Sequence, residues 1–244
     1  MPHVCDWLKS AQPDVVLLQE LKCQTEAFPY EAIEDAGYQA AVYGQKTYNG
    51  VAILAKNSLE DVVCGNEFFD DSAARVIEAV VDGQFRVISV YVPNGESVSS
   101  EKYAYKLDFL NAFAQLLENR LYLDEKLIVG GDFNVAPSDL DVYNPETWRG
   151  RILCSTGERL AFRSLINLGL TDALRFKNPQ LEGLYSWWDY RSGGFAQNHG
   201  LRIDHLLVSP KAIESLSGVG VDREMRARER PSDHAPVWVT FGGA

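Results

Sequence analysis

Short apolar runs of strand length alternate with helical stretches along this chain, and that alternation restricts it to a layered α/β fold. The run DVVLLQE at 14–20 is continuously apolar in its centre, which predicts a strand covered on both faces. Further strands are predicted at 127–131, 201–208 and 236–241. We therefore expect helices packed against β-sheets.

Turn signals indicate how the strands are joined. Asp82–Gly83 divides the apolar stretch at 75–94 into two strands, and this dipeptide is typical of a tight hairpin. Asn49–Gly50 predicts a second turn directly before a strand. Because hairpins join antiparallel strands, the sheets should be mixed and not purely parallel.

Helices are predicted from the spacing of apolar side chains. Val4, Trp7 and Leu8 share one helical face near the start of the chain. Ser99 and Ser100 can cap a long amphipathic helix, and another helix is predicted near 157–168. The apolar face of the long helix consists of Tyr103, Leu107, Leu110, Leu117 and Leu121.

The composition fits one domain spanning 1–244. The chain has 244 residues, of which 46% are hydrophobic, and contains no linker or internal repeat. It has no apolar run long enough to cross a membrane and no signal pattern at its start. The cysteines are scattered without a C-x-x-C pair, which indicates a reduced, cytoplasmic protein without structural zinc. They are Cys5, Cys23, Cys64 and Cys154. We expect a monomer.

The net charge of −11 argues mildly against a nucleic-acid partner, because phosphate binding normally draws on excess lysine and arginine. A cluster of carboxylates that binds a divalent cation would also make the total negative while serving a phosphate substrate. Composition alone therefore leaves the partner open.

Acidic and amide side chains stand at the boundaries of several predicted strands, where they can converge on one edge of a sheet. Such a set suits a Mg²⁺ site for phosphodiester hydrolysis, because Mg²⁺ prefers oxygen ligands and the reaction needs a base and a cationic group. Each residue alone is more often a helix cap or turn residue, whereas the whole set favours the catalytic interpretation. The set consists of Glu20, Asp132, Asn134, Asp204, Asp233 and His234.

Five motifs in this order closely resemble the exonuclease III family of the exonuclease–endonuclease–phosphatase superfamily: LLQELK, GGDFNVAP, SWWDYRSGGF, GLRIDHLL and PSDHAPVW. GDFN and SDHAP alone are typical of the whole superfamily, which includes sphingomyelinases and inositol phosphatases. SWWDYRSGGF ahead of LRIDH resembles the DNA-repair branch. The resemblance implies a four-layer α/β sandwich, in which two mixed β-sheets pack face to face with helices outside.

The resemblance also implies an activity and a partner. The enzyme would depend on Mg²⁺, with Mn²⁺ as a substitute. It would act on duplex DNA with recessed 3′ ends or abasic sites, as a 3′-to-5′ exodeoxyribonuclease and an abasic-site endonuclease. Glu20 would be the main metal ligand, with Asp233 near the metal. Asp132 would deprotonate the attacking water, and Asn134 would orient that water or the phosphate.

The remaining roles implied by the resemblance concern the phosphate. His234, partnered by Asp204, would stabilise the pentacoordinate phosphate. Tyr91 in SVYVPNG would contact the scissile phosphate, together with Asn94 from the same loop.

DNA contacts are expected from an aromatic and basic loop. Trp187, Trp188 and Arg191 resemble the loop that lines an abasic-sugar pocket, since aromatic faces stack on bases or sugars and arginine reaches phosphate. The alternative for the paired tryptophans is an ordinary core position. Asn49 and Arg75 resemble positions that contact the DNA backbone.

The start of the chain departs from the family pattern. Family members begin with a strand whose asparagine lies in the metal site, whereas this sequence opens at MPHVCDWLK, which corresponds to the first helix. We therefore expect a truncated gene model, a sheet without that strand and a metal site without that oxygen-bearing neighbour. Water can fill the position, because Mg²⁺ keeps several water ligands.

Three functions remain open from the sequence. The first is the Mg²⁺-dependent DNA-repair nuclease. The second is a phosphatase or phospholipase of the same superfamily, acting on a small or lipid phosphodiester. The third is a DNA-binding protein that is inactive because its first strand is missing.

Overall fold

A computed structural model describes residues 2–242. The strands are β1 (Val15–Gln19), β2 (Gln39–Tyr43), β3 (Val51–Ala55), β4 (Leu59–Cys64), β5 (Val76–Val81), β6 (Phe85–Tyr91), β7 (Lys126–Asp132), β8 (Thr171–Asp172), β9 (Asp204–Val208), β10 (Leu216–Val221) and β11 (Val237–Phe241). The helices are α1 (Pro2–Ala11), α2 (Tyr30–Glu34), α3 (Glu101–Leu121), α4 (Pro145–Trp148), α5 (Thr156–Asn167), α6 (Ala173–Lys177) and α7 (Pro210–Ile213).

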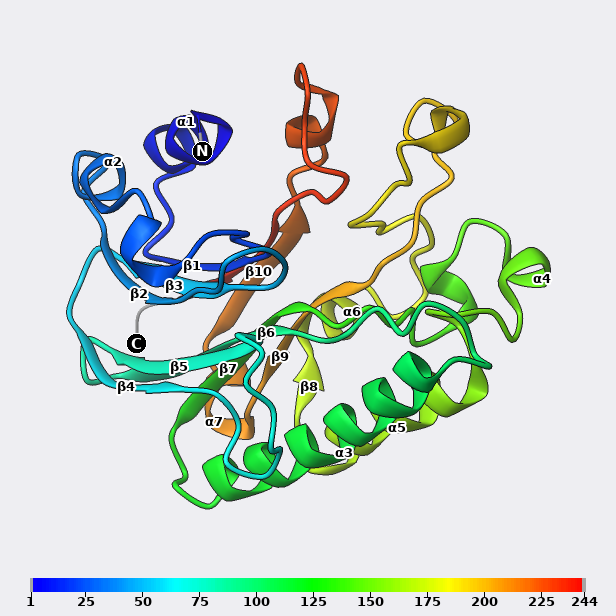
Figure 1. Cartoon of the computed structure of the whole chain (residues 1–244), viewed down its shortest axis with the longest axis horizontal. Coiled ribbons are helices and arrows are strands. Elements are labelled where there is room, and N and C mark those ends of the chain that lie inside the picture. The colour runs from blue at the N-terminus through cyan, green and yellow to red at the C-terminus, as the bar shows by residue number, and fades with distance from the viewer. Residues whose placement is uncertain (1, 243–244) are drawn as a thin grey trace.

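The strands form two layers between helices (Figure 1). The larger sheet has the order β4-β5-β6-β7-β9-β8, in which β6 and β7 are parallel and all other neighbours antiparallel. The facing layer consists of two antiparallel sheets, β1-β3-β2 and β10-β11. The expected α/β sandwich with a mixed sheet is confirmed, and its second layer is divided in two.

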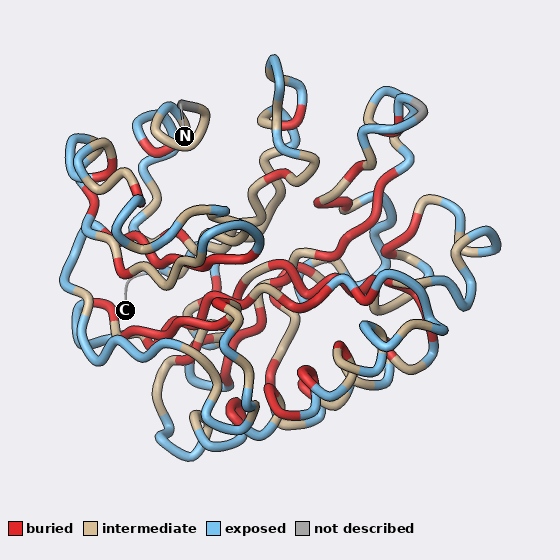
Figure 2. Tube along the Cα trace, in the orientation of Figure 1, coloured by how far each residue is buried: buried red, intermediate tan, exposed pale blue. Residues whose placement is uncertain are grey.

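Three apolar clusters hold these layers together, and buried residues concentrate where the layers meet (Figure 2). One cluster joins α1 and α2 to β1 and β3 through Leu8, Ile33 and Leu54. A second lies between the sheets and includes Ile53 and Ile77. The third packs α3 and α5 against the larger sheet. Helices therefore cover the outer face of each sheet layer.

Helix α3 follows the predicted pattern. The Ser100 side chain accepts a hydrogen bond from the backbone N–H of Tyr103 at 3.2 Å, which caps the helix at its N-terminus. One face is buried against the sheet, and it includes Leu110 and Leu117. The Asp82–Gly83 turn is also confirmed, since both residues have the positive φ that such a turn requires and it joins β5 to β6. Asn49 and Gly50 also have positive φ and directly precede β3, but the structure assigns no turn to them.

One strand prediction is confirmed and another needs correction. Strand β1 is covered on both faces, because Val15 and Leu17 pack in the cluster between the sheets while Val16 and Leu18 pack in the cluster with α1 and α2. The predicted strand at 201–208 begins at Asp204, and Leu201 instead forms isolated bridges with Val142 and Trp187.

Candidate active site

Three adjacent strands of the larger sheet place their polar ends in one row. Tyr91 at the end of β6 is the register partner of Asp132 at the end of β7, and Asp132 is the partner of Asp204 at the start of β9. Register partners project from the same face of a sheet. The hydrogen-bonding register thus brings three of the predicted residues together.

The glycine before Asp132 allows β7 to approach β6 at this row. Gly131 has φ +148°, and a Cβ atom there would lie 2.0 Å from the carbonyl oxygen of Val90. Any side chain would push β7 away from β6. The glycines of LIVGGDFN therefore let a buried strand end with its carboxylate against its neighbour.

Asp132 and Asn134 form a buried hydrogen-bonded pair. The backbone N–H of Asn134 donates to Asp132 Oδ1 at 2.8 Å, and its side-chain amide donates to Asp132 Oδ2 at 2.9 Å. Asn134 takes φ +50°, an uncommon conformation that these bonds help to hold. The Asn94 side chain donates to Asn134 Oδ1 at 3.0 Å. The polar relay thus extends from Asp132 to the exposed loop after β6.

His234 reaches the row from the C-terminal segment. His234 Nδ1 lies 2.9 Å from Asp204 Oδ2, and His234 Nε2 lies 4.0 Å from Asp132 Oδ2. The segment is held in place by backbone pairing, because Trp188 N donates to Asp233 O and Ala235 N donates to Ser186 O. The predicted Asp–His pair therefore faces the predicted base.

The two central groups have pKa values shifted in a way that suits acid–base chemistry. Burial raises the pKa of Asp132 to about 7, with His234 opposing this shift. Burial alone would lower the pKa of His234, but the charge and hydrogen bond of Asp204 raise it to about 10. Near neutral pH, Asp132 can accept a proton while His234 stays cationic.

Glu20 lies beside the row on a strained loop. Its Oε1 accepts a hydrogen bond from the Tyr91 hydroxyl at 2.6 Å, and its Oε2 lies 2.6 Å from Lys22 Nζ. Burial opposes these contacts, but both hydrogen bonds lower the pKa of Glu20. Glu20 and Lys22 have positive φ, and backbone bonds from Leu21 and Lys22 to Gly50 and Asn49 hold the loop.

The donor set fits a hard divalent cation that retains water ligands. The Glu20 side chain is 38% exposed and carries oxygen donors of the kind that Mg²⁺ prefers. Asp233 Oδ2 accepts a hydrogen bond from Trp187 Nε1 at 2.9 Å. Within residues 2–242 no three acidic, histidine or cysteine side chains form a preassembled metal cage. The residues therefore match an open site and not a closed structural one.

The predicted DNA-contacting residues have unequal exposure. Trp188 is 1% exposed in an apolar cluster, which corrects the expectation that it lines the surface and favours the core alternative. Trp187 is half-buried and bonded to Asp233. Arg191 is exposed and paired with Asp189. Asn94 is also exposed.

The two predicted backbone-contacting residues take structural positions. Asn49 is buried, and its carbonyl fixes the Glu20 loop by accepting a hydrogen bond from the backbone N–H of Lys22. Arg75 is half-buried, and its guanidinium lies 5.2 Å from the centre of the Tyr91 ring. Both residues support other members of the site.

A basic segment beside the site was missed by the sequence prediction. Four arginines occur within 223–230, and no carboxylate in the described part of the chain forms an ion pair with any of them. Arg226 is buried with its guanidinium 4.9 Å from the Tyr190 ring centre. The sequence does contain an indication of this segment, because four arginines cluster just before PSDHAP in an otherwise acidic chain. The arginine segment consists of Arg223, Arg226, Arg228 and Arg230.

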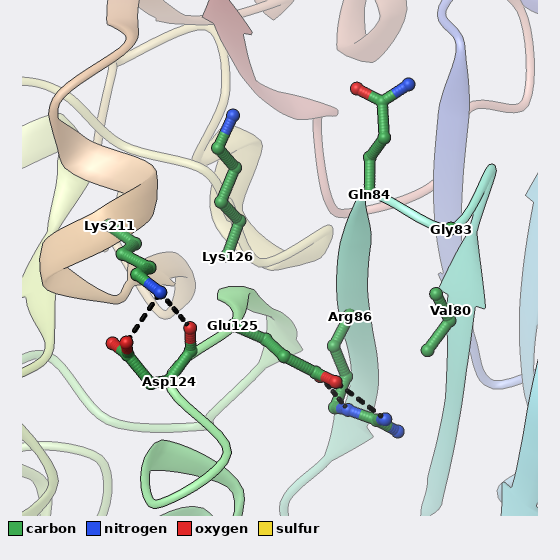
Figure 3. A pocket seen from close by; sticks show the side chains of 8 residues that line it. All are labelled: Val80, Gly83, Gln84, Arg86, Asp124, Glu125, Lys126 and Lys211. Carbon is green, nitrogen blue, oxygen red and sulfur yellow. Dashed lines mark hydrogen bonds and ion pairs between the residues drawn. The ribbon is translucent and has the colours of Figure 1, made fainter.

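A separate hollow of about 400 Å³ lies at the opposite end of the larger sheet (Figure 3). It lies at the starts of β6 and β7, about 20 Å from their other ends at a rise of about 3.3 Å per residue. Its Arg86 and Lys211 are paired with Glu125 and Asp124. This pairing makes it a poor match for an anionic substrate.

Comparison with known proteins places the chain. Residues 2–234 match the endonuclease/exonuclease/phosphatase family. The chain is 40% identical to exodeoxyribonuclease III of Haemophilus influenzae, covering 98% of this chain and 94% of that protein.

Two solved structures agree with this family assignment. A 3′ phosphatase, NExo, from Neisseria bound to a product DNA hairpin has a TM-score of 0.96 and 45% identity, covering 99% of this chain and 94% of that one. An AP endonuclease from Archaeoglobus fulgidus has a TM-score of 0.93 and 34% identity, covering 98% and 92%. The chain therefore belongs to the endonuclease/exonuclease/phosphatase family and, within it, to the exonuclease III group of DNA-repair nucleases.

Proposed function

We propose that this protein hydrolyses phosphodiester bonds of duplex DNA with the help of Mg²⁺, acting at 3′ ends and at abasic sites. The observation that carries the proposal is the pairing of a buried carboxylate with a cationic imidazole. Asp132 Oδ2 and His234 Nε2 are 4.0 Å apart, and their pKa values are about 7 and about 10. Such a pair can remove a proton from water and stabilise the charge on phosphate.

Each residue of the row takes one part of the reaction. Asp132 accepts the proton of the attacking water, while the amide of Asn134 holds the carboxylate in orientation through its 2.9 Å hydrogen bond. His234 donates hydrogen bonds to the phosphate oxygens as an imidazolium, and Asp204 fixes the ring through Nδ1. Tyr91 orients Glu20 and faces the phosphate.

Glu20 and Asp233 are the proposed ligands of the metal. A bound Mg²⁺ would neutralise charge on the phosphate, and metal dependence is typical of the family. The Glu20 carboxylate is held by Tyr91 and Lys22 without being enclosed, so it remains accessible. Mn²⁺ has the same preference for carboxylate and water ligands and is the proposed substitute.

Duplex DNA is the proposed partner. The arginine segment offers unpaired positive charge beside the row in a chain with net charge −11. We propose that a monomer binds DNA there, with Trp187 and Arg191 on the other side of the site. The four scattered cysteines support a cytoplasmic protein, and no helix among residues 2–242 is long and apolar enough to span a bilayer.

A 3′-phosphatase activity is the second candidate. The relative NExo, at 45% identity, is described as a 3′ phosphatase bound to product DNA. Removing a terminal phosphate uses the same attack of water on phosphorus, so the same row would serve. The third possibility, a phosphatase or phospholipase acting on a small or lipid phosphodiester, differs from the DNA nuclease and the 3′ phosphatase in its substrate.

One set of assays tests these proposals. Four substrates are compared with and without EDTA: a duplex with one abasic site, a recessed 3′ end, a 3′-phosphorylated end and a small phosphodiester such as bis-p-nitrophenyl phosphate. Metal-dependent turnover of the duplexes supports the repair nuclease. Turnover of the small diester alone would contradict it, and DNA binding without any cleavage would favour the binding-only alternative.

A further inference from the structure

A buried lysine contacts the backbone next to the row of polar residues at the ends of β6 and β7. The Lys106 side chain, on α3, is 0% exposed, and so is that of its ion-pair partner Glu158 on α5. Removing an ammonium group from water is costly unless every donor finds an acceptor. A fully buried ion pair at this position therefore needs a structural or functional reason.

The partners of Lys106 connect it to the site. Its Nζ donates to the backbone carbonyl of Asn134 at 2.6 Å, to the backbone carbonyl of Asn94 at 3.1 Å, and to the Glu158 carboxylate. An ammonium group has three donors, and all three are used. Two of them hold the backbones of the two asparagines in the polar relay.

The same two asparagines are joined to Asp132 through their side chains. The Asn94 amide donates to Asn134 Oδ1, and the Asn134 amide donates to Asp132 Oδ2. Lys106 thus fixes the main chain of both asparagines from behind while their side chains meet Asp132 in front. These bonds help to hold Asn134 in the sparsely populated left-handed region at φ +50°, which asparagine tolerates better than most residues.

Two neighbouring residues, Gly95 and Glu158, accommodate the buried lysine. A Cβ atom on Gly95 would lie 3.0 Å from Lys106 Cδ, so a glycine lets the Asn94 loop reach the lysine. Glu158 accepts a hydrogen bond from the backbone N–H of Leu153, and another from that of Ser155 as part of the N-terminal capping box of α5. The lysine therefore ties the relay to the ends of two helices.

We propose that Lys106 is a positioning residue, which holds Asn94 and Asn134 in the geometry that Asp132 needs for proton transfer. This proposal rests on the proposed function. Lys106 does not touch the substrate or the reacting water. Its loss should therefore slow the chemical step much more than it weakens DNA binding, because Asn94 is the one exposed residue among the groups that its ammonium contacts.

The test is Lys106→Met, which keeps the length of the side chain and removes the donors. We expect kcat on abasic-site DNA to fall by about 100-fold, as a displacement of about 1 Å in a catalytic group can cause, while KM stays within about twofold. Lys106→Arg, which restores charge and donors, should recover part of the rate. A Lys106→Met enzyme with normal kcat would overturn the proposal.

A control separates positioning from general destabilisation. Leu110→Ala creates a cavity on the same helix, in an apolar cluster that contains neither asparagine, so it should lower the melting temperature and leave kcat near wild type. If the two variants lost kcat in proportion to their loss of melting temperature, Lys106 would have only a structural role. If Lys106→Met fails to fold, Lys106→Met with Glu158→Gln replaces it, because that pair leaves no unpaired buried charge.

A spectroscopic measurement tests the proposal without activity. The side-chain amide resonances of Asn94 and Asn134 should shift in a ¹⁵N correlation spectrum of the double variant and stay in place in Leu110→Ala. Unchanged resonances would overturn the positioning role even if the rate fell. If the wild-type protein did not cleave DNA, the proposed function would be contradicted. The resonance shifts of Asn94 and Asn134 would still show whether Lys106 positions these residues.

Discussion

The proposed active site consists of two halves that differ in burial. Asp132 and Asn134 are each 4% exposed at the end of the continuous six-stranded sheet. Glu20 and Lys22 lie on a loop beyond β1, and their side chains are 38% and 59% exposed. The strands beneath differ in the same way, because β7 has neighbours on both sides whereas β1 pairs only with β3.

The difference assigns a different physical task to each half. In the buried half, loss of water raises the pKa of Asp132 to about 7, so a carboxylate becomes a base suited to neutral pH. In the exposed half, the lowered pKa keeps Glu20 ionised. Its 38% exposed side chain would let a bound cation exchange with bulk water. The buried half should control rate and pH dependence, and the exposed half should control metal and DNA affinity.

The largest effect is expected from removing the buried base. Asp132→Asn should lower kcat by about 10²–10⁴-fold, because the carboxamide cannot accept a proton. The dissociation constant for abasic DNA should change by less than about twofold, measured by fluorescence anisotropy. Asp108→Asn, at an exposed position of α3, is the matched control. A cleavage rate near wild type would mean that another group serves as the base.

The next effect concerns pH. Asp132 works as a base only when ionised, so the rate should fall about tenfold per pH unit below about 7. His234 works only when protonated, so the rate should also fall above about 10. In Asp204→Asn the charge that raises the pKa of His234 is lost, and the alkaline limb should move toward the ordinary histidine value of about 6.5.

The pH–rate profile of kcat measures this directly. Interacting groups titrate as a pair, so the limbs report the combined Asp132–His234 site. Asp108→Asn should leave both limbs in place. An alkaline limb that Asp204→Asn leaves in place would show that protonation of His234 does not limit the rate. His234 would then have no part in the acid–base chemistry of the buried half.

In the exposed half, Glu20→Gln should act on metal binding. The Mg²⁺ concentration for half-maximal cleavage should rise by about tenfold, with a smaller change in kcat at saturating metal. Mn²⁺ binding, followed by electron paramagnetic resonance, gives the affinity without turnover. Glu26→Gln, an exposed carboxylate in the neighbouring turn, is the control. An unchanged metal titration would remove Glu20 from the ligands.

The buried half could largely be predicted from sequence because local patterns specify it. The apolar run before Asp132 predicts a strand, the adjacent glycines indicate close backbone approach, and the motif containing His234 follows the family. The register that aligns Asp132 with Tyr91 and Asp204 depends on pairing between distant strands, and single-sequence patterns do not fix it.

The supporting contacts were less predictable for the same reason. The positive φ of Glu20 and Lys22 depends on Asn49 and Gly50, which lie about thirty residues away. Lys106 carried a weak signal, because it lies between Tyr103 and Leu110 on the apolar stripe of α3. A charged residue on such a stripe needs a buried partner, and only the three-dimensional packing identifies Glu158.

The smallest effect is expected from the arginine segment, whose charges lie outside the reacting row. Arg228→Gln with Arg230→Gln should weaken DNA binding several-fold and make the plot of log affinity against log salt concentration less steep by about 1–2 units. The kcat at saturating DNA should stay near wild type, since neither residue contacts Asp132 or His234. Arg163→Gln, on an exposed part of α5, removes the same kind of charge away from the site. An unchanged salt dependence would place the DNA backbone elsewhere, and the exposed half would then bind metal alone.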